Sequence, residues 1–256
     1  MQKRTALCAF GIPLQVMSII VPAILPSSRA DLVEKLGKLA GLVDEVQVDI
    51  VDGKFATPPT WPYDTGPQEL ARMLAEGDVI PSASESKIEI DLMVENPEST
   101  AGAWIELGAT RIVIHAASTP HLDRILKSFG TLYGHDKTFD AGLLSIGIAI
   151  TPDVDPETLA PYVEQIDYVQ FMGIRRVGRQ GQPFDETIYH TIERFRKAHP
   201  NMPVQVDGGV SLATAPKLLE LGVSRLVIGS ALWKAPDFNQ ALGQLKELTE
   251  QHGIYE

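Results

Sequence analysis

Three aspartates, Asp49, Asp91 and Asp207, are the residues of this chain best placed to do chemistry. Each lies in or directly after a short apolar run with the composition of a β-strand. Burying carboxylates together without partners is costly, so such a cluster should share protons, hold a cation or hydrogen-bond a ligand. One aspartate alone could equally be a solvated loop end, but three at strand ends favour a functional site.

The run 46–51 shows how these side chains would point. Side chains alternate along a strand, so Gln47 and Asp49 share one face while Val48 and Ile50 share the other. The apolar pair should pack against helices. Gln47 and Asp49 are therefore predicted to face the interior of a closed sheet.

A second set of residues suits an anion. Gly208 and Gly209 follow Asp207 directly, and Gly229 and Ser230 follow the strand-like run 225–228. Backbone amides at such turns commonly hold phosphate groups in barrel enzymes. The alternative is that these glycines only permit tight turns.

The elements that must position these residues alternate between strand and helix. This alternation predicts a parallel sheet of the α/β class. Eight units in 256 residues fit a single-domain (β/α)₈ TIM barrel that spans 1–256. Residues 1–16 are predicted to form a short N-terminal extension before the first strand. The predicted strands are 18–25, 46–51, 88–94, 111–115, 144–150, 168–172, 204–206 and 225–228. The predicted helices include 29–42, capped by Ser28, and 99–107, 185–197, 212–221 and 238–251. Long connections are expected at 55–67, 77–86 and 130–142, and long loops in compact domains are usually functional or mobile.

Composition limits the partners. A net charge of -11 argues against nucleic acid, because phosphate backbones are bound by basic surfaces. The only cysteine, Cys8, excludes an intramolecular disulfide and fits a reducing compartment, so we expect a cytoplasmic protein. The apolar stretch 6–25 contains Gln15, Pro13 and Pro22 and makes a poor membrane span, so no membrane partner is expected.

Five segments, in order, resemble the signature segments of the ribulose-phosphate 3-epimerase family: 21–25 (Val-Pro-Ala-Ile-Leu), 47–55, 91–95, 206–210 and 229–231. The similarity covers nearly the whole chain. It implies interconversion of D-ribulose 5-phosphate and D-xylulose 5-phosphate through an enediolate, with a small phosphorylated sugar as ligand and a homo-oligomeric assembly.

The resemblance also implies roles for single residues. Asp49 and Asp207 would move protons at C3 on opposite faces of the sugar. Gly208, Gly209, Gly229, Ser230 and, in the loop after 168–172, Gly181 would hold the phosphate. Met93 and Met172 match methionines that line the family's pocket, although a buried methionine is more often ordinary packing.

The chain departs from the family at the metal site. Gln47 and Asp91 stand where the family has metal-binding histidines, and Ala23 stands where it has a serine. The remaining set of Asp49, Asp207, Asp91 and Gln47 offers only oxygen ligands, which suits Mg²⁺ or Mn²⁺ better than Zn²⁺. A site without metal fits these residues equally well.

The loop 172–184 resembles the family's glycine-rich loop only at its ends. Arg175, Arg176 and Arg179 interrupt it. Arginine forks suit a second anion or a different sugar, with Arg175 and Arg179 as the candidates, or the loop is a cationic surface at a subunit contact. Two alternative functions therefore stay open: a related ketose-phosphate isomerase or lyase with a changed substrate, and a non-catalytic phosphosugar-binding homologue.

Overall fold

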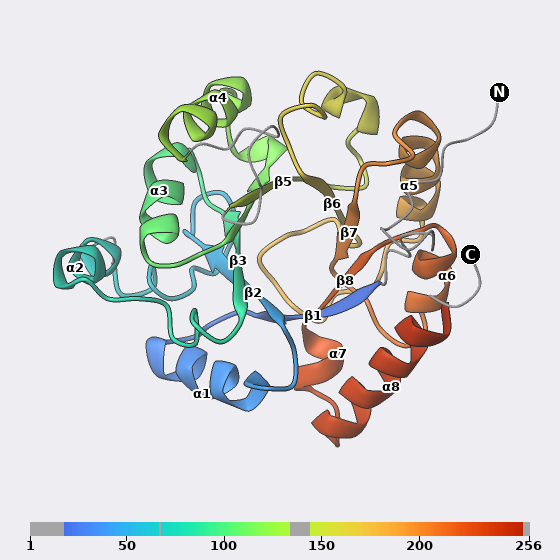
Figure 1. Cartoon of the computed structure of the whole chain (residues 1–256), viewed down its shortest axis with the longest axis horizontal. Helices are drawn as coiled ribbons and strands as arrows, with labels where there is room; N and C mark the ends of the chain where they lie inside the picture. Colours follow the sequence, from blue (N-terminus) through green and yellow to red (C-terminus); the bar gives the residue numbers. More distant parts are fainter. Residues whose placement is uncertain (1–17, 67, 134–143, 253–256) are drawn as a thin grey trace, which may run out of the picture.

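The computed structural model describes residues 18–66, 68–133 and 144–252 and contains a closed barrel of eight parallel strands (Figure 1). Each strand pairs with the next one along the chain, and the last pairs with the first, so the sheet has no free edge. The strands are β1 (Ile19–Ile24), β2 (Glu45–Val51), β3 (Lys87–Met93), β4 (Arg111–His115), β5 (Ser145–Ile150), β6 (Tyr168–Met172), β7 (Val204–Asp207) and β8 (Arg225–Ile228). The predicted (β/α)₈ barrel is confirmed.

Helices surround the barrel on its outside, as Figure 1 shows. They are α1 (Arg29–Leu39), α2 (Gln68–Glu76), α3 (Glu98–Glu106), α4 (Leu122–Tyr133), α5 (Thr187–Ala198), α6 (Ala215–Glu220), α7 (Ser230–Trp233) and α8 (Phe238–His252), with the short 3₁₀ turns η1 (Ala116–Ser118) and η2 (Pro156–Leu159). No helix among the described residues combines the length and the apolar character needed to cross a bilayer.

Most predicted boundaries agree with the structure to within a residue or two, and the N-cap of α1 is the predicted one. The side chain of Ser28 accepts a hydrogen bond from the Asp31 amide at 3.1 Å. Two helices are shorter than predicted. The helix predicted over 29–42 ends at Leu39, where Ala40 becomes extended, and the one predicted over 212–221 begins at Ala215, with proline in its first turn.

Two predictions lie beyond what the structure describes. The N-terminal extension 1–16 falls outside the described residues, as does most of the connection 130–142. The connection 55–67, by contrast, is described except for its last residue, and it follows β2 at the carboxyl end of the barrel.

The two faces of the barrel strands differ in chemistry. Outward residues such as Val48 and Ile50 belong to the large apolar cluster that the helices cover. The inward face is strongly polar: Gln47, Glu89 and Gln205 are completely buried within the barrel. Buried polar groups need hydrogen-bond partners, so the barrel interior must be an ordered polar network.

Candidate active site

The predicted aspartates meet at the carboxyl end of the barrel. Asp49 on β2 is in register with Asp91 on β3, and Asp207 ends β7. One carboxylate oxygen from each lies within 4.8 Å of the other two. All three are buried, with exposed fractions of 5%, 0% and 8%.

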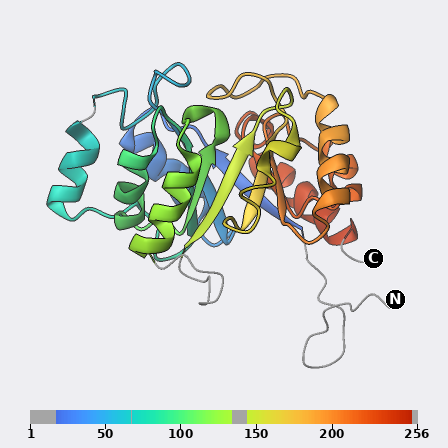
Figure 2. The same cartoon turned by 90° about the horizontal axis from the view of Figure 1, so that it is seen from above.

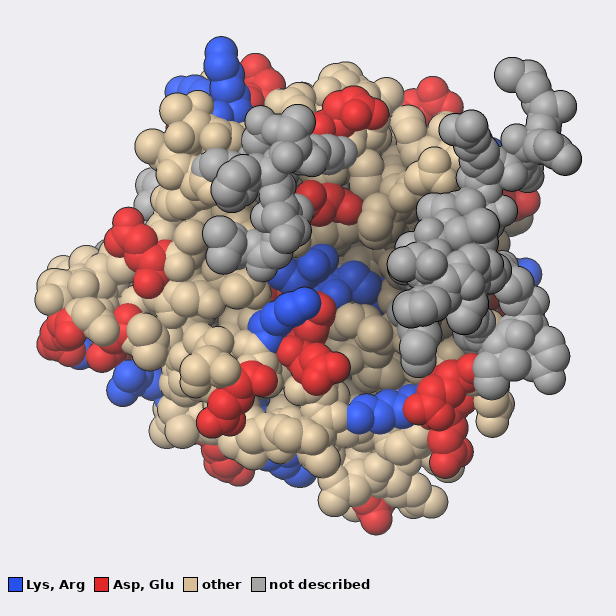
Figure 3. Space-filling view, in the orientation of Figure 1, with Lys and Arg blue, Asp and Glu red and all other residues tan. Residues whose placement is uncertain are grey.

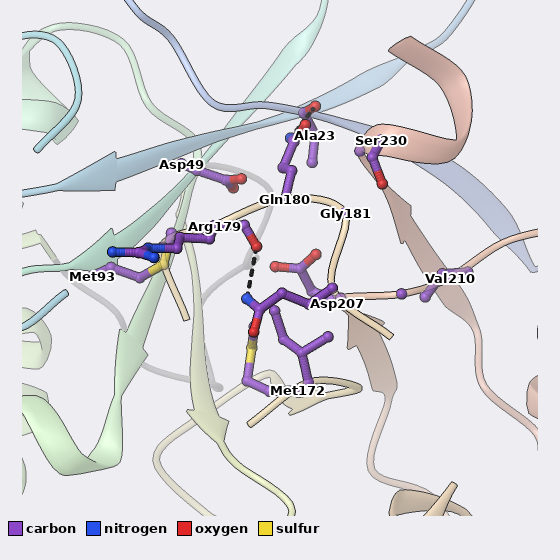
Figure 4. Close-up of a pocket in the computed structure, with 16 residues that line it drawn as sticks. Ala23, Asp49, Met93, Met172, Arg179, Gln180, Gly181, Asp207, Val210 and Ser230 are labelled. Atoms are coloured by element: carbon purple, nitrogen blue, oxygen red, sulfur yellow. Dashed lines mark hydrogen bonds between the residues drawn. The ribbon is translucent and has the colours of Figure 1, made fainter. Parts of the chain in front are cut away.

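Amide groups connect these carboxylates. The Nε2 of Gln47 donates to Oδ1 of Asp49 at 2.8 Å and to Oδ2 of Asp207 at 3.2 Å. Gln47 therefore bridges the two aspartates that the family resemblance assigns to proton transfer. Figure 4 shows the carboxyl groups of Asp49 and Asp207 in the same pocket.

The third aspartate is held separately. Oδ1 of Asp91 lies 2.9 Å from Nε2 of His115, and its Oδ2 accepts a hydrogen bond from the Gln170 amide at 3.2 Å. The His115 ring packs against Phe55, with 5.5 Å between ring centres. Both oxygens of Asp91 are thus engaged by side chains of the barrel.

Burial changes the acidity of the bridged pair. Burial, followed by the nearby charge of Asp91, raises the pKa of Asp207 to about 7, although Gln47 and His115 act in the opposite direction. Burial, with Asp207 and Asp91 adding to it, also raises the pKa of Asp49 well above its ordinary value. Carboxyl groups with raised pKa values are suited to general acid and base catalysis near neutral pH.

A pocket opens directly above this pair. The space between its lining atoms is about 480 Å³, open solvent included. Ten residues predicted for the site line it: Asp49, Met93, Met172, Arg179, Gly181, Asp207, Gly208, Gly209, Gly229 and Ser230. Gln47 and Asp91 do not line the pocket, and neither does Arg175, which is exposed and pairs with Asp185.

The glycines at one side of the pocket also serve packing. A Cβ atom on Gly208 would lie 2.7 Å from the Ile174 side chain, and one on Gly209 would lie 2.9 Å from the Phe184 backbone. The turn after β7 can therefore pack this closely against the segment after β6 only with glycine at both positions. Close packing and exposed amides are compatible, so both interpretations of these glycines stand.

The segment 173–186 between β6 and α5 crosses the carboxyl end of the barrel, at the top of Figure 2. Its Arg179 donates from Nε to the backbone oxygen of Thr57 at 2.8 Å, across the pocket on the segment after β2. Val177 packs into an apolar cluster with Ala56 and Met93. The segment therefore partly roofs the pocket.

Several residues of the site were not predicted. Gln180 lines the pocket, and its amide lies 2.6 Å from the place a Cβ of Gly229 would take. Gln170 and Gln205 lie in the barrel interior beneath the aspartates. The alternation that placed Gln47 could have found them, because Gln170 shares a strand face with Met172, and Gln205 shares one with Asp207.

Comparison with known proteins agrees with this geometry. Residues 19–233 match the model of the ribulose-phosphate 3 epimerase family. The chain belongs to this family. The predicted resemblance to this family is confirmed, and the chain is an isomerase of the epimerase type.

Individual epimerases are similar at moderate identity. The ribulose-phosphate 3-epimerase of Schizosaccharomyces pombe is 27% identical over 232 residues, covering 90% of this chain and 93% of that protein. The chloroplastic ribulose-5-phosphate-3-epimerase of Arabidopsis thaliana is 29% identical over 236 residues, covering 89% of this chain and 76% of that protein. The similarity to epimerases thus spans almost the whole barrel.

Solved structures outside the epimerase family share the fold. A KGPDC from Streptococcus mutans superposes with a TM-score of 0.64 at 13% identity, covering 94% of this chain and 100% of that one. A 3-hexulose-6-phosphate synthase from Salmonella typhimurium gives 0.61 at 15% identity, covering 91% and 99%. At this identity the likeness extends to the barrel architecture alone.

Proposed function

We propose that the protein interconverts D-ribulose 5-phosphate and D-xylulose 5-phosphate, with Asp49 and Asp207 as its two proton-transfer groups. The observation that carries this proposal is the pair itself: two buried carboxyl groups, joined by one amide, at the floor of an open pocket. The resemblance to epimerases over some nine-tenths of the chain supports it.

The chemistry follows from two carboxyl groups in different protonation states. One carboxylate removes the proton from C3 of the sugar, which leaves an enediolate. The other group, present as the acid, returns a proton to C3 from the opposite face. Raised pKa values allow one of the pair to be protonated near neutral pH while its partner is ionised.

The phosphate would lie at the glycine side of the pocket. Gly208, Gly209, Gly229 and Ser230 line the pocket, and their backbone amides are the proposed donors, together with that of Gly181. Met93 and Met172 would form the apolar walls. Arg179 also lines the pocket and is the arginine we propose to contact the substrate.

The distances between the carboxylate oxygens would allow a divalent cation, but the hydrogen bonds that these oxygens already accept do not favour one. The oxygens of the three aspartates are close enough to hold one ion, and oxygen ligands would suit Mg²⁺ or Mn²⁺ rather than Zn²⁺. However, the amide nitrogen of Gln47 faces both Asp49 and Asp207, and both oxygens of Asp91 are engaged. The two carboxyl groups therefore carry the proposed proton transfers without a metal step.

We also propose where the protein acts, in which pathway, and how it assembles. We propose a cytoplasmic enzyme of the pentose phosphate pathway that assembles as a homo-oligomer, with neither nucleic acid nor membrane as a partner. The net charge of -11 supports the exclusion of nucleic acid. Light scattering on the purified protein tests the assembly, and a monomer mass would contradict it.

The decisive experiment measures epimerisation of D-ribulose 5-phosphate together with deuterium entry at C3 from heavy water. We expect turnover and exchange in the wild type, and a loss of about 10²- to 10⁴-fold in turnover for Asp49→Asn and for Asp207→Asn. Asp64→Asn, an exposed aspartate after β2, is the matched control and should behave as wild type.

The two readouts separate the alternatives. Binding of the sugar phosphate without deuterium entry would contradict an epimerase and leave a binding protein. Deuterium entry without formation of D-xylulose 5-phosphate would show enediolate chemistry on a different product.

A further inference from the structure

The base of the barrel, opposite the pocket, is closed by a charged cluster. Oε2 of Glu89 accepts hydrogen bonds from Arg111 Nε at 2.9 Å, the Tyr168 hydroxyl at 2.8 Å and Arg225 Nη2 at 3.3 Å. Arg225 also pairs with Glu45. Figure 3, which views the end of the barrel where the strands begin, shows basic and acidic side chains together at its centre.

This cluster fixes the orientation of Gln205. Arg225 Nε donates to Oε1 of Gln205, and Nε2 of Gln205 donates to Oε1 of Glu89 at 2.6 Å. A guanidinium group can only donate and a carboxylate can only accept. If the Gln205 amide were turned over, its nitrogen would face the Arg225 guanidinium and its oxygen would face the Glu89 carboxylate. Its oxygen must therefore face Arg225 at the base, and its nitrogen must face the barrel axis.

Gln205 in turn fixes two further amides. Its Nε2 also lies 2.6 Å from Oε1 of Gln170 and 3.2 Å from Oε1 of Gln47, so its two N–H groups are shared among three acceptors, of which Gln47 is the most distant. With their oxygens turned toward Gln205, both amides direct their nitrogens toward the mouth. The Gln47 nitrogen meets Asp49 and Asp207, and the Gln170 nitrogen meets Asp91.

The result is a chain of amides with one polarity, from the arginine at the base to the carboxylates of the pocket. A cation between Asp49 and Asp207 would need lone pairs directed at it, whereas Gln47 directs N–H groups there. Gln47 cannot turn without breaking its bond to Gln205, which Arg225 holds. Complete burial of Gln47, Gln170 and Gln205 leaves no solvent to compensate for such a break.

We propose that Gln47, oriented by Gln205, takes the place of a divalent cation between Asp49 and Asp207, so that these carboxylates work without bound metal. The inference rests on the proposed function for the roles of the two aspartates. The amide donates one N–H to each carboxylate and so keeps the two together without a cation. Gln205 is a positioning residue, because it acts only through Gln47 and Gln170.

The test measures metal binding directly. The full-length protein is purified without chelator for elemental analysis, then stripped and titrated with Mn²⁺ while the free ion is followed by electron paramagnetic resonance. We expect no stoichiometric metal in the purified protein and no saturable Mn²⁺ binding. About one equivalent of bound metal, or tight Mn²⁺ binding by the wild type, would overturn the proposal.

Gln47→Glu replaces the N–H donor with an oxygen of the same shape. It should show saturable Mn²⁺ binding, at least about 10-fold tighter than the weakest binding the titration detects, because a further oxygen ligand then faces the aspartates. Gln165→Glu adds the same charge on the exposed surface after η2 and should show none. Equal Mn²⁺ affinity in Gln47→Glu and wild type would contradict the proposal.

Gln205→Met tests the positioning role and also serves if Gln47→Glu fails to fold. It removes the donor that holds the Gln47 oxygen, leaves every residue at the carboxylates unchanged, and should allow Gln47 to turn its oxygen toward an ion. We expect a gain in Mn²⁺ affinity, which a residue that only supports the fold would not produce. No gain would show that Gln205 does not set the Gln47 orientation.

Turnover is then compared in chelator and in Mn²⁺. Equal rates support the proposal, and activity restored only by Mn²⁺ overturns it. Absence of any turnover would count against the epimerase assignment, while the metal-binding result would still decide this inference.

Discussion

Burial of the Asp207 carboxyl group lowers the free energy of unfolding at neutral pH. Its pKa is raised from an ordinary value of 3.8 to about 7, chiefly by burial. Between these two pH values the folded protein binds more protons than the unfolded chain, so the free energy of unfolding falls as pH rises from about 4 to about 7 and then levels off. A residue kept despite this cost is expected to be functional.

Asp207→Asn should therefore stabilise the protein more at high pH than at low pH. Because asparagine does not ionise, we expect the variant to gain on the order of 2 kcal/mol relative to wild type between pH 5 and pH 8. Urea unfolding at the two pH values, in chelator, measures the difference. An identical offset at both pH values would show that the group does not titrate as described, and Asp64→Asn gives the baseline for an exposed aspartate.

At the scale of elements, the segment between β6 and α5 partly covers the pocket and is attached to the segment after β2. Gly178 has φ +82°, and a Cβ there would lie 2.8 Å from the Cβ of Ala56. The covering segment thus approaches the segment after β2 at a position that only glycine tolerates. Arg179 and Val177 attach it on either side of that point.

Gly178→Ala should loosen this attachment. A left-handed backbone strained by a side chain costs about 1–3 kcal/mol, so we expect KM for the sugar phosphate to rise about tenfold or more and the melting temperature to fall by a few degrees. Steady-state kinetics measure it. Gly243→Ala in α8, where a Cβ meets no atom within 4 Å, is the matched control and should stabilise the fold by about 0.5–1 kcal/mol with unchanged KM.

Arg175 and Arg179 of the covering segment should differ. Arg179→Met removes a charge-assisted bond to Thr57 and a cation from the pocket, so we expect KM to rise about 10- to 100-fold. Arg175→Met breaks only an exposed pair with Asp185 and should leave KM within about twofold of wild type, since exposed pairs contribute little. Equal effects of the two variants would remove Arg179 from the proposed substrate contacts.

At the scale of the whole molecule, the charged base closes the barrel. Burial raises the pKa of Glu89, but the charges of Arg225 and Arg111, together with hydrogen bonds from Arg111 and Gln205, outweigh burial and leave the pKa lowered. The stability that Glu89 contributes is therefore present above the ordinary glutamate pKa and is lost as pH falls through the lowered value. The base should loosen only in acid.

Glu89→Ala would leave both arginines without their shared partner inside the barrel. Breaking a buried ion pair by removing one member costs about 3–5 kcal/mol, and we expect a loss of that size in urea unfolding at pH 7. Glu193→Ala, which removes an exposed helical pair with Lys197, should change stability by less than about 0.5 kcal/mol. A small loss for Glu89→Ala would mean that the arginines find other acceptors.

Features that depend on local pattern were predictable from the sequence. Alternation in β2 placed Gln47 and Asp49 inside, and apolar runs located all eight strands, because both follow from the period of a strand. The glycines after β7 and β8 line the pocket for the same local reason: they follow strand ends in a parallel barrel.

Features that depend on closure of the barrel were not predicted. Glu89 and Arg111 are register partners on the neighbouring strands β3 and β4, whereas Arg225 on β8 reaches Glu89 only across the closed barrel. The same holds for Gln205, whose hydrogen bonds reach β2, β3 and β6. Sequence alternation shows which residues point inward, but not which of them meet.

The amide chain through the barrel affects which positions should vary together among related sequences. Because Arg225 fixes Gln205, and Gln205 fixes Gln47, a substitution at the base changes which groups face the sugar at the mouth. A relative that lacks the arginine could turn its glutamines and bind a metal ion. A relative that has the arginine should keep both glutamines in their present orientation. Among relatives of this chain, these three positions should therefore change together rather than one at a time.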